Sequence, residues 1–240
     1  MIFYDQLGCG RSDRPDDTSL WTVEHFVREL GAVRGALGLD HFHIFGSSWG
    51  GMLALQYIFD YRPASVASLL MAGSPASMPR SVAGCQELLA ELPAEVREVI
   101  ERHEARGFTS CPEYVAAVSV FYRQHLCRLQ PWPDGLERTF AEMSAVVYET
   151  MNGPSEFTVT GRIRDWDVFD RLKDIKVLTL VMGGRYDEIR VDHLTDIHKA
   201  VASSELVIFE NSGHTPFHDE REAFMARVNE FLDRVEHLAR

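Results

Sequence analysis

Short apolar runs alternate with amphipathic stretches over the first 76 residues of the chain. Residues 42–45 and 66–71 are brief and apolar, which is typical of buried strands, and residues 2–4 predict a further short strand. Residues 49–57 predict a helix, and a second helix is predicted from Thr22 onward. That stretch places its apolar residues at helical spacing, at Val23, Phe26, Leu30, Val33 and Leu37. The order strand, helix, strand predicts parallel βαβ units.

The alternation stops between about residues 77 and 157, where the pattern is helical only, and then resumes. Apolar runs at 177–182 and 206–209 predict two more strands separated by a helix. A last helix is predicted by apolar residues at helical spacing, Phe224, Val228, Phe231 and Val235. We therefore expect an α/β fold in which residues 1–76 and 158–240 form one core, a mostly parallel sheet flanked by helices. The helical stretch is expected to form a cap inserted into that core.

The composition narrows the classes of function. Apolar residues make up 45% and charged residues 25%, as in ordinary globular proteins. The net charge of -12 repels phosphate backbones and anionic lipid headgroups, so neither nucleic acid nor a membrane is an expected partner. No apolar run approaches the roughly 20 residues needed to span a bilayer, and the first residues lack the basic region of a signal peptide. We expect a cytoplasmic protein.

The cysteines predict neither a disulfide framework nor a zinc site. They show no CxxC spacing and no companion histidine pattern. We therefore expect no metal and four reduced thiols, on Cys9, Cys85, Cys111 and Cys127.

A possible nucleophile lies between a predicted strand and a predicted helix. The sequence Gly46-Ser47-Ser48-Trp49-Gly50 fits G-x-S-x-G, and this context predicts a sharp turn that exposes the Ser48 hydroxyl. We expect the glycines two residues to either side to be required because such a turn crowds its neighbours. The amide of Trp49 follows the nucleophile, at the start of a helix, where it can donate to a developing oxyanion. The alternative is a glycine-rich turn that carries a solvated serine.

A base and an acid are expected at the ends of two later strands. A serine hydroxyl needs a positioned base, and the base needs an acid that holds its tautomer. Asp187 follows the apolar run at 177–182 and His214 follows the run at 206–209, and open α/β sheets place functional groups at these strand ends. Considered alone, Asp187 could be an ordinary carboxylate in a turn, and His214 could be a loop histidine that bonds to the backbone. Their joint placement and the order Ser48, Asp187, His214 favour an α/β-hydrolase triad. His218 is the rival base, and we expect it to be a surface or supporting residue.

Five segments resemble the proline iminopeptidase branch of the α/β-hydrolases, which also includes amino acid amidases. The resemblance covers nearly the whole chain and rests on residues 5–12 (Asp-Gln-Leu-Gly-Cys-Gly-Arg-Ser), 46–51 (Gly-Ser-Ser-Trp-Gly-Gly), 152–157 (Asn-Gly-Pro-Ser-Glu-Phe), 184–188 (Gly-Arg-Tyr-Asp-Glu) and 212–214 (Ser-Gly-His). It implies an α/β-hydrolase fold with a helical cap. It also implies a serine exopeptidase that works through an acyl-enzyme without metal or organic cofactor. Such an enzyme releases an N-terminal residue, preferably proline, from short peptides or amino acid amides with a free N-terminus.

Two glutamates resemble the family's pair that binds the substrate amine. Glu188 is adjacent to Asp187, and Glu156 lies where the helical stretch rejoins the core. Two carboxylates suit an exopeptidase because both can pair with the ammonium group of a free N-terminus. When a substrate has no ammonium group, the two negative charges stay unpaired and repel each other. The alternative is a pair of solvated glutamates at segment ends. We also expect Trp49, Phe121 and Tyr122 to form walls of a pyrrolidine pocket, although aromatic residues in helices usually belong to a core.

The resembled family has further strands and a His-Gly-Gly-Pro-Gly loop before the stretch that matches residues 2–5. No part of this sequence corresponds to them. In the family that loop gives one of the two donors to the oxyanion, so the Trp49 amide is the one donor left in this sequence. We therefore expect the chain to be N-terminally incomplete, with the first strands of the fold missing. Two alternatives to the exopeptidase stay open: an ester or lactone hydrolase of the same fold, and a non-catalytic remnant. The oligomeric state is not indicated by the sequence.

Overall fold

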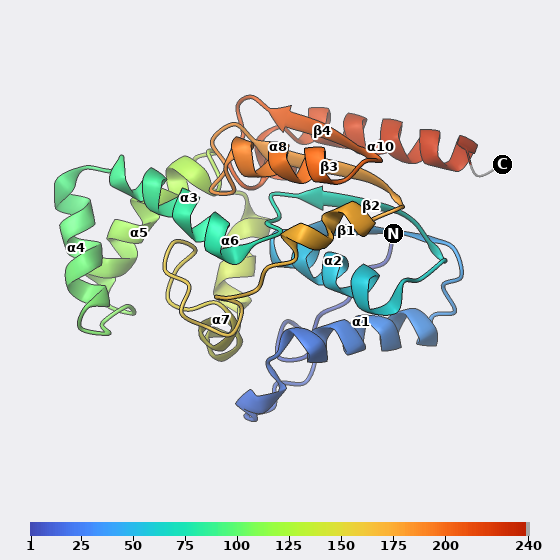
Figure 1. The fold of residues 1–240 in the computed structure, drawn as a ribbon. Helices are drawn as coiled ribbons and strands as arrows, with labels where there is room; N and C mark the ends of the chain where they lie inside the picture. The colour runs from blue at the N-terminus through green and yellow to red at the C-terminus, as the bar shows by residue number, and fades with distance from the viewer. Residues whose placement is uncertain (239–240) are drawn as a thin grey trace.

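Four parallel strands in the order β1-β2-β3-β4 form the sheet of the protein (Figure 1). The computed structural model describes residues 1–238 of the chain. The strands are β1 (Phe42–Ser47), β2 (Val66–Ala72), β3 (Leu178–Gly184) and β4 (Ser204–Phe209). All three pairings are parallel, so every strand points its carboxyl end to the same edge. The predicted α/β class and the four predicted strands after residue 40 are confirmed.

Helices cover both faces of this sheet. On one face lie α1 (Val23–Ala36), α2 (Trp49–Tyr61) and α8 (Val191–Ala200), which pack in one apolar cluster with Leu69 and Met71 of β2. On the other face α10 (Arg221–Leu238) packs on Leu70 and Ala72 of the same strand. Successive side chains of β2 therefore point to opposite faces of the sheet, and both faces are buried.

The predicted strand at residues 2–4 is wrong. These residues form no strand, and the side chains of Ile2 and Phe3 are exposed. A strand exists only when a neighbour takes up its backbone N–H and C=O groups, and none of the four described strands pairs with this segment. An apolar run alone therefore does not make a strand here.

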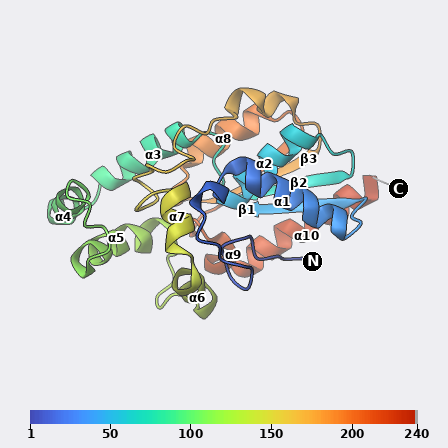
Figure 2. The same cartoon turned by 90° about the horizontal axis from the view of Figure 1, so that it is seen from below.

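Five helices occupy the chain between β2 and β3: α3 (Met78–Ala90), α4 (Ala94–Glu104), α5 (Pro112–His125), α6 (Asp134–Glu142) and α7 (Ala145–Met151). They project beyond the carboxyl edge of the sheet (Figures 1 and 2). Part of this segment has an apolar cluster of its own, which includes Cys85, Tyr114, Phe121 and Phe157. The division into a core of 1–76 and 158–240 and a cap of 77–157 stays a prediction.

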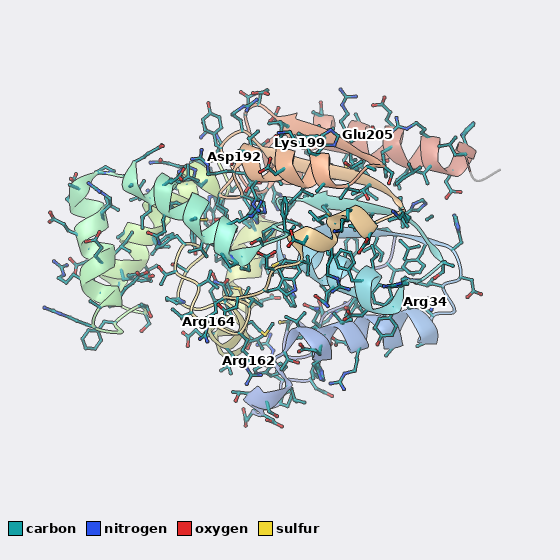
Figure 3. The ribbon with its side chains drawn as sticks, viewed as in Figure 1. Arg34, Arg162, Arg164, Asp192, Lys199 and Glu205 are labelled. Atoms are coloured by element: carbon teal, nitrogen blue, oxygen red, sulfur yellow. The ribbon has the colours of Figure 1, made fainter. Side chains whose placement is uncertain are left out.

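The remaining described elements are short. They are the 3-10 turns η1 (Thr18–Leu20) and η2 (Phe169–Asp174) and the single-turn helix α9 (Pro216–Asp219). Charged side chains such as Asp192 and Lys199 of α8 lie on the outside of the fold (Figure 3). None of the helices described in residues 1–238 is long and apolar enough to cross a membrane.

Candidate active site

Ser48 lies on a strained turn that joins β1 to α2. Its backbone has φ 52° and ψ -121°, a conformation that residues other than glycine rarely adopt. The turn is held because the Ser48 amide donates to the carbonyl of Ala72 over 2.9 Å. Strain maintained by surrounding bonds is typical of functional positions, and here it places the serine at the carboxyl edge of the sheet.

Of the two glycines expected to be required in this turn, one is required and the other is not. A Cβ on Gly46 would collide with the backbone of Gly50, which confirms the predicted need there. A Cβ on Gly50, by contrast, would meet nothing within 4 Å outside its own helix. The second required glycine is Gly51, whose Cβ would collide with the side chain of Ser74. The space after the nucleophile is limited by the segment that follows β2 rather than by the turn itself.

The loops after β3 and β4 bring Asp187 and His214 into direct contact. The Nδ1 atom of His214 lies 2.8 Å from Oδ1 of Asp187, and both residues are buried. The same carboxylate oxygen accepts the Ile189 amide over 2.8 Å, which fixes the orientation of the carboxylate. The backbone of His214 is held from the helical segment, because its amide donates to the carbonyl of His125 at the end of α5.

Sequence reasoning missed Gly73, which packs against this pair. Gly73 has φ 54°, and a Cβ there would lie 2.8 Å from His214 Nδ1 and 2.9 Å from Asp187 Oδ2. The residue follows β2, and the signal that would have found it is a glycine at the carboxyl end of a strand beside the one that leads to the nucleophile. A larger residue here would collide with both the acid and the base.

Carboxylates dominate the electrostatics around His214. Burial lowers the pKa of His214, but the carboxylates of Asp187 and Glu188 outweigh it and raise the pKa to about 10. Burial raises the pKa of Glu188 well above its ordinary value, the charge on His214 lowers it, and Glu156 raises it further. Because the Glu188 Oε1 atom lies 3.6 Å from His214 Nε2, the protonation states of the two groups depend on each other.

Ser48, Trp49, His214 and both glutamates line one cavity of about 440 Å³. Asp187 lies behind His214 and does not line it. Among the hydrogen bonds of residues 1–238, none joins Ser48 Oγ to His214, a contact that is often long in unliganded enzymes and shortens when substrate binds. The structure therefore brings the six predicted site residues together, with the serine and the histidine facing the same space.

Glu156 reaches the cavity from the loop after α7. Its Oε1 atom accepts the hydroxyl of Tyr148 over 2.7 Å, and that hydroxyl in turn accepts the side-chain amide of Asn152 over 3.1 Å. Tyr148 and Asn152 also line the cavity. The sequence predicted no role for either residue, although Asn152 belongs to the resembling segment 152–157, because their roles depend on how α7 packs.

The aromatic walls differ from the prediction. Trp49 lines the cavity, but Phe121 and Tyr122 do not. Phe121 is fully buried against Phe157, so it belongs to an apolar core, as aromatic residues in helices usually do. The walls are formed by apolar residues from both sides of the cavity, among them Phe26, Met52, Leu136, Phe140, Met143, Val147, Met151 and Phe217.

His218 lies closer to the cavity than expected but is not paired with the acid. It belongs to α9 and lines the cavity, and burial lowers its pKa. Within residues 1–238 the side-chain oxygens of Asp187 accept hydrogen bonds only from His214 and Ile189. His214, rather than His218, has the geometry of the base.

Comparison with known proteins agrees with this architecture. The family described as alpha/beta hydrolase fold matches residues 1–221. A proline iminopeptidase of Saccharolobus solfataricus is 42% identical over 98% of this chain and 76% of its own length. Among solved structures, VinJ has a TM-score of 0.93 at 39% identity, over 97% of this chain and 80% of that one. The proline iminopeptidase of Mycobacterium smegmatis has a TM-score of 0.87 at 37% identity, over 97% of this chain and 79% of that one.

A parallel sheet with a serine on a strained turn and a histidine–aspartate pair at its carboxyl edge defines a serine hydrolase. The chain belongs to the α/β-hydrolase fold family and, within it, to the proline iminopeptidase branch. The family resemblance expected from the sequence is thereby confirmed.

Proposed function

We propose that this enzyme is a serine exopeptidase that releases the N-terminal residue, preferably proline, from short peptides or amino acid amides. The observation that carries the proposal is one cavity that presents a strained serine, a carboxylate-paired histidine and two further carboxylates. The similarity to proline iminopeptidases supports the preference for proline. The four free cysteines support a cytoplasmic location.

The proposed reaction begins when Ser48 Oγ attacks the carbonyl carbon of the first residue. Nε2 of His214 takes the hydroxyl proton, and Asp187 Oδ1 stabilises the resulting imidazolium through its bond to Nδ1. The C–N bond then breaks, and His214 returns the proton to the leaving amine. Water, deprotonated by the same histidine, hydrolyses the ester on Ser48 and frees the amino acid and the serine.

The amide of Trp49 is the proposed donor to the oxyanion. It is the first residue of α2, so its N–H has no acceptor within the helix and lies at the positive end of the helix dipole. The Trp49 side chain is held in place because its Nε1 donates to Oε1 of Gln6 over 3.0 Å. An amide donor of this kind contributes about 10² to 10³ in rate.

Glu156 and Glu188 are proposed to bind the free amine of the substrate. The negative charge of Glu188 raises the pKa of His214, and the positive charge of His214 lowers the pKa of Glu188. A bound ammonium offers Glu188 a better partner and adds a positive charge near His214, so the pKa of His214 falls toward the range in which it acts as a base at neutral pH. Recognition of the amine and activation of the serine are thus coupled.

We further propose that residues 77–157 act as a cap that determines the size of the substrate. Residues of α6 and α7, among them Phe140 and Tyr148, line the cavity opposite the residues of the core. The cavity's volume suits one small residue and the start of a second. A longer chain on the amino side of the scissile bond would have to displace the glutamate pair.

Hydrolysis of three substrates by the 240-residue protein tests the proposed function. Proline-β-naphthylamide is expected to be hydrolysed, and N-acetylproline-β-naphthylamide is expected to be a poor substrate because it lacks the ammonium that the glutamates bind. Comparable turnover of both naphthylamides, or turnover of p-nitrophenyl acetate alone, would favour the ester hydrolase instead. Turnover of none of the three would favour the non-catalytic alternative.

A further inference from the structure

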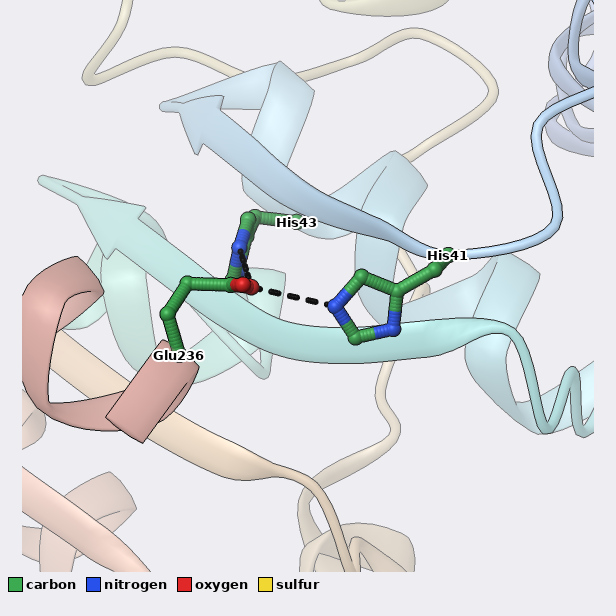
Figure 4. Close-up of side chains that lie close together, drawn as sticks. All are labelled: His41, His43 and Glu236. Carbon is green, nitrogen blue, oxygen red and sulfur yellow. Dashed lines mark hydrogen bonds and ion pairs between the residues drawn. The ribbon is translucent and has the colours of Figure 1, made fainter. Parts of the chain in front are cut away.

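Two histidines and a glutamate converge at the end of β1 that lies away from the catalytic serine. His41 immediately precedes β1, His43 is the second residue of the strand, and Glu236 lies in the last turns of α10. The Nε2 atoms of both histidines lie 3.0 Å from the same oxygen, Oε1 of Glu236 (Figure 4). Ser48 follows the other end of the strand, on the order of 15 Å away at the rise of an extended chain.

We propose that His41, His43 and Glu236 form a binding site for a divalent transition-metal ion, with Zn²⁺ as the occupant to which we commit. Two imidazole nitrogens and one carboxylate oxygen are a ligand set that suits Zn²⁺ and its neighbours in the first transition row. Mg²⁺ and Ca²⁺ prefer oxygen ligands throughout and are not expected to bind. Water would complete the coordination, since the His41 and Glu236 side chains remain 57% and 44% exposed.

The three ligand atoms lie within 4.8 Å of one another, and two of their separations are close to those of a metal site. Zn²⁺ holds nitrogen and oxygen ligands at about 2.0 to 2.1 Å, which places neighbouring ligand atoms of a tetrahedron about 3.3 Å apart. The two N···O separations of 3.0 Å would each have to widen by about 0.3 Å. That shift is within reach of the exposed side chain of His41 and the terminal atoms of Glu236.

The second nitrogen of His43 is already positioned for metal binding. Its Nδ1 atom lies 2.7 Å from Oγ of Ser68, the fully buried residue opposite it on β2. When the site is empty, Ser68 donates to Nδ1 and the Nε2 proton points to Glu236. When an ion binds, the proton moves to Nδ1, the Ser68 hydroxyl accepts it, and the Nε2 lone pair is free for the ion. Ser68 is thus a positioning residue that satisfies either tautomer.

An ion at this place would connect two elements that are far apart in the sequence. The ligands join the start of β1 to the end of α10, the helix that covers one face of the sheet. Because the folded chain brings these ligands together and the unfolded chain does not, binding is expected to stabilise the fold. The site does not touch the catalytic cavity, so this proposal stands independently of the proposed function.

Titration of the chelator-treated 240-residue protein with ZnCl₂, in competition with a chromophoric chelator, tests the proposal. We expect one equivalent of Zn²⁺ to be lost in the double variant His41→Gln/His43→Gln, and MgCl₂ to give no response in either protein. Ser68→Ala should weaken Zn²⁺ binding roughly 10- to 100-fold while keeping the stoichiometry. His237→Gln is the matched control, since this exposed neighbour of Glu236 bonds to its own helix and should leave binding unchanged.

Thermal unfolding gives a second readout. At a Zn²⁺ concentration 100 times Kd, the Tm of the unchanged protein should rise by roughly 5 to 10 °C, and that of the double variant should not rise through this site. If the double variant does not fold, His41→Gln alone tests the same site, because this side chain is exposed. Absence of Zn²⁺ binding to the unchanged protein, or equal stoichiometry and affinity in the double variant, would overturn the proposal.

Discussion

The edge of the sheet and the helical segment above it contribute to the same cavity in different ways. The sheet edge supplies Ser48, Asp187 and His214, each from a loop directly after a strand and each held by backbone hydrogen bonds or by a glycine that admits no side chain. The helical segment supplies Glu156 and apolar side chains such as Phe140, which depend on how several helices pack. We propose that the reaction chemistry and Glu188 depend on strand-end geometry, whereas the share of substrate selection due to Glu156 and the apolar walls depends on helix packing.

The largest effect is expected at the sheet edge, from Asp187→Asn. The amide would still contact His214 but would favour the wrong tautomer, so kcat should fall by about 10³- to 10⁴-fold with a smaller change in KM. The measurement is the steady-state rate with proline-β-naphthylamide. Asp192→Asn on the exposed surface of α8 is the control and should keep the full rate. A loss below tenfold for Asp187→Asn would mean that strand-end geometry does not carry the chemistry.

A paired glycine substitution tests how tightly the turn is held. Gly51→Ala should destabilise the fold by about 1 to 3 kcal/mol because its Cβ collides with Ser74. Gly50→Ala adds a methyl that meets nothing and removes a helical glycine, so its stability should equal or exceed that of the unchanged protein. Denaturant unfolding of the two variants measures both. Equal losses would contradict the steric account of the turn.

These two regions also differ in how far the sequence predicted them. The strand-end rule and the G-x-S-x-G pattern predicted Ser48, Asp187 and His214 because both are local signals that the fold carries to a common edge. The same reasoning failed for residues 2–4, since strand formation depends on a partner rather than on an apolar run. It also exchanged Gly50 for Gly51, because the crowding comes from Ser74, a residue of another segment.

For the helical segment the sequence predicted less. The helices themselves follow from periodicity, but which face of each helix meets the cavity depends on contacts between segments. Phe121 and Phe140 are both aromatic residues on predicted helices, yet the first is buried against Phe157 and the second lines the cavity. Glu156 was expected only from the family resemblance, and its partner Tyr148 carried no signal.

Next in size is the effect of the glutamate pair on selection of the amine. Glu156→Gln and Glu188→Gln should each raise KM for proline-β-naphthylamide by about 10- to 100-fold, because each removes a charge-assisted hydrogen bond to a desolvated ammonium. The pH-independent rate with p-nitrophenyl acetate, above the acid limb of its profile, should change much less. Equal effects on both substrates would show that the two glutamates do not recognise the amine.

The pH profile of the ester reaction separates the two glutamates. His214 must be neutral to act as a base, and its pKa is raised to about 10, so the acid limb of kcat/KM for p-nitrophenyl acetate should lie well above the ordinary histidine value. Glu188→Gln removes a carboxylate that raises this pKa, so the limb should move to lower pH. Glu156 is a weaker cause, and its variant should move the limb less. An unshifted limb in Glu188→Gln would contradict the coupling.

The smallest effect on the rate is expected from the apolar walls. Phe140→Ala should alter KM for proline-β-naphthylamide several-fold with little change in kcat, because it enlarges the cavity without touching the reacting groups. Phe121→Ala should instead lower the free energy of unfolding by about 3 to 5 kcal/mol, as expected for a fully buried phenylalanine. Denaturant unfolding and steady-state kinetics on both variants check this contrast. A change of KM in Phe121→Ala but not in Phe140→Ala would contradict it.

Covalent labelling by a fluorophosphonate, read by peptide mass spectrometry, tests the central claim most directly. Ser47 and Ser48 are adjacent and both line the cavity, but only Ser48 has the strained backbone of the turn. The account predicts one adduct, on Ser48, that is lost in Ser48→Ala and kept in Ser47→Ala. An adduct that persists in Ser48→Ala, or one that requires Ser47, would contradict it.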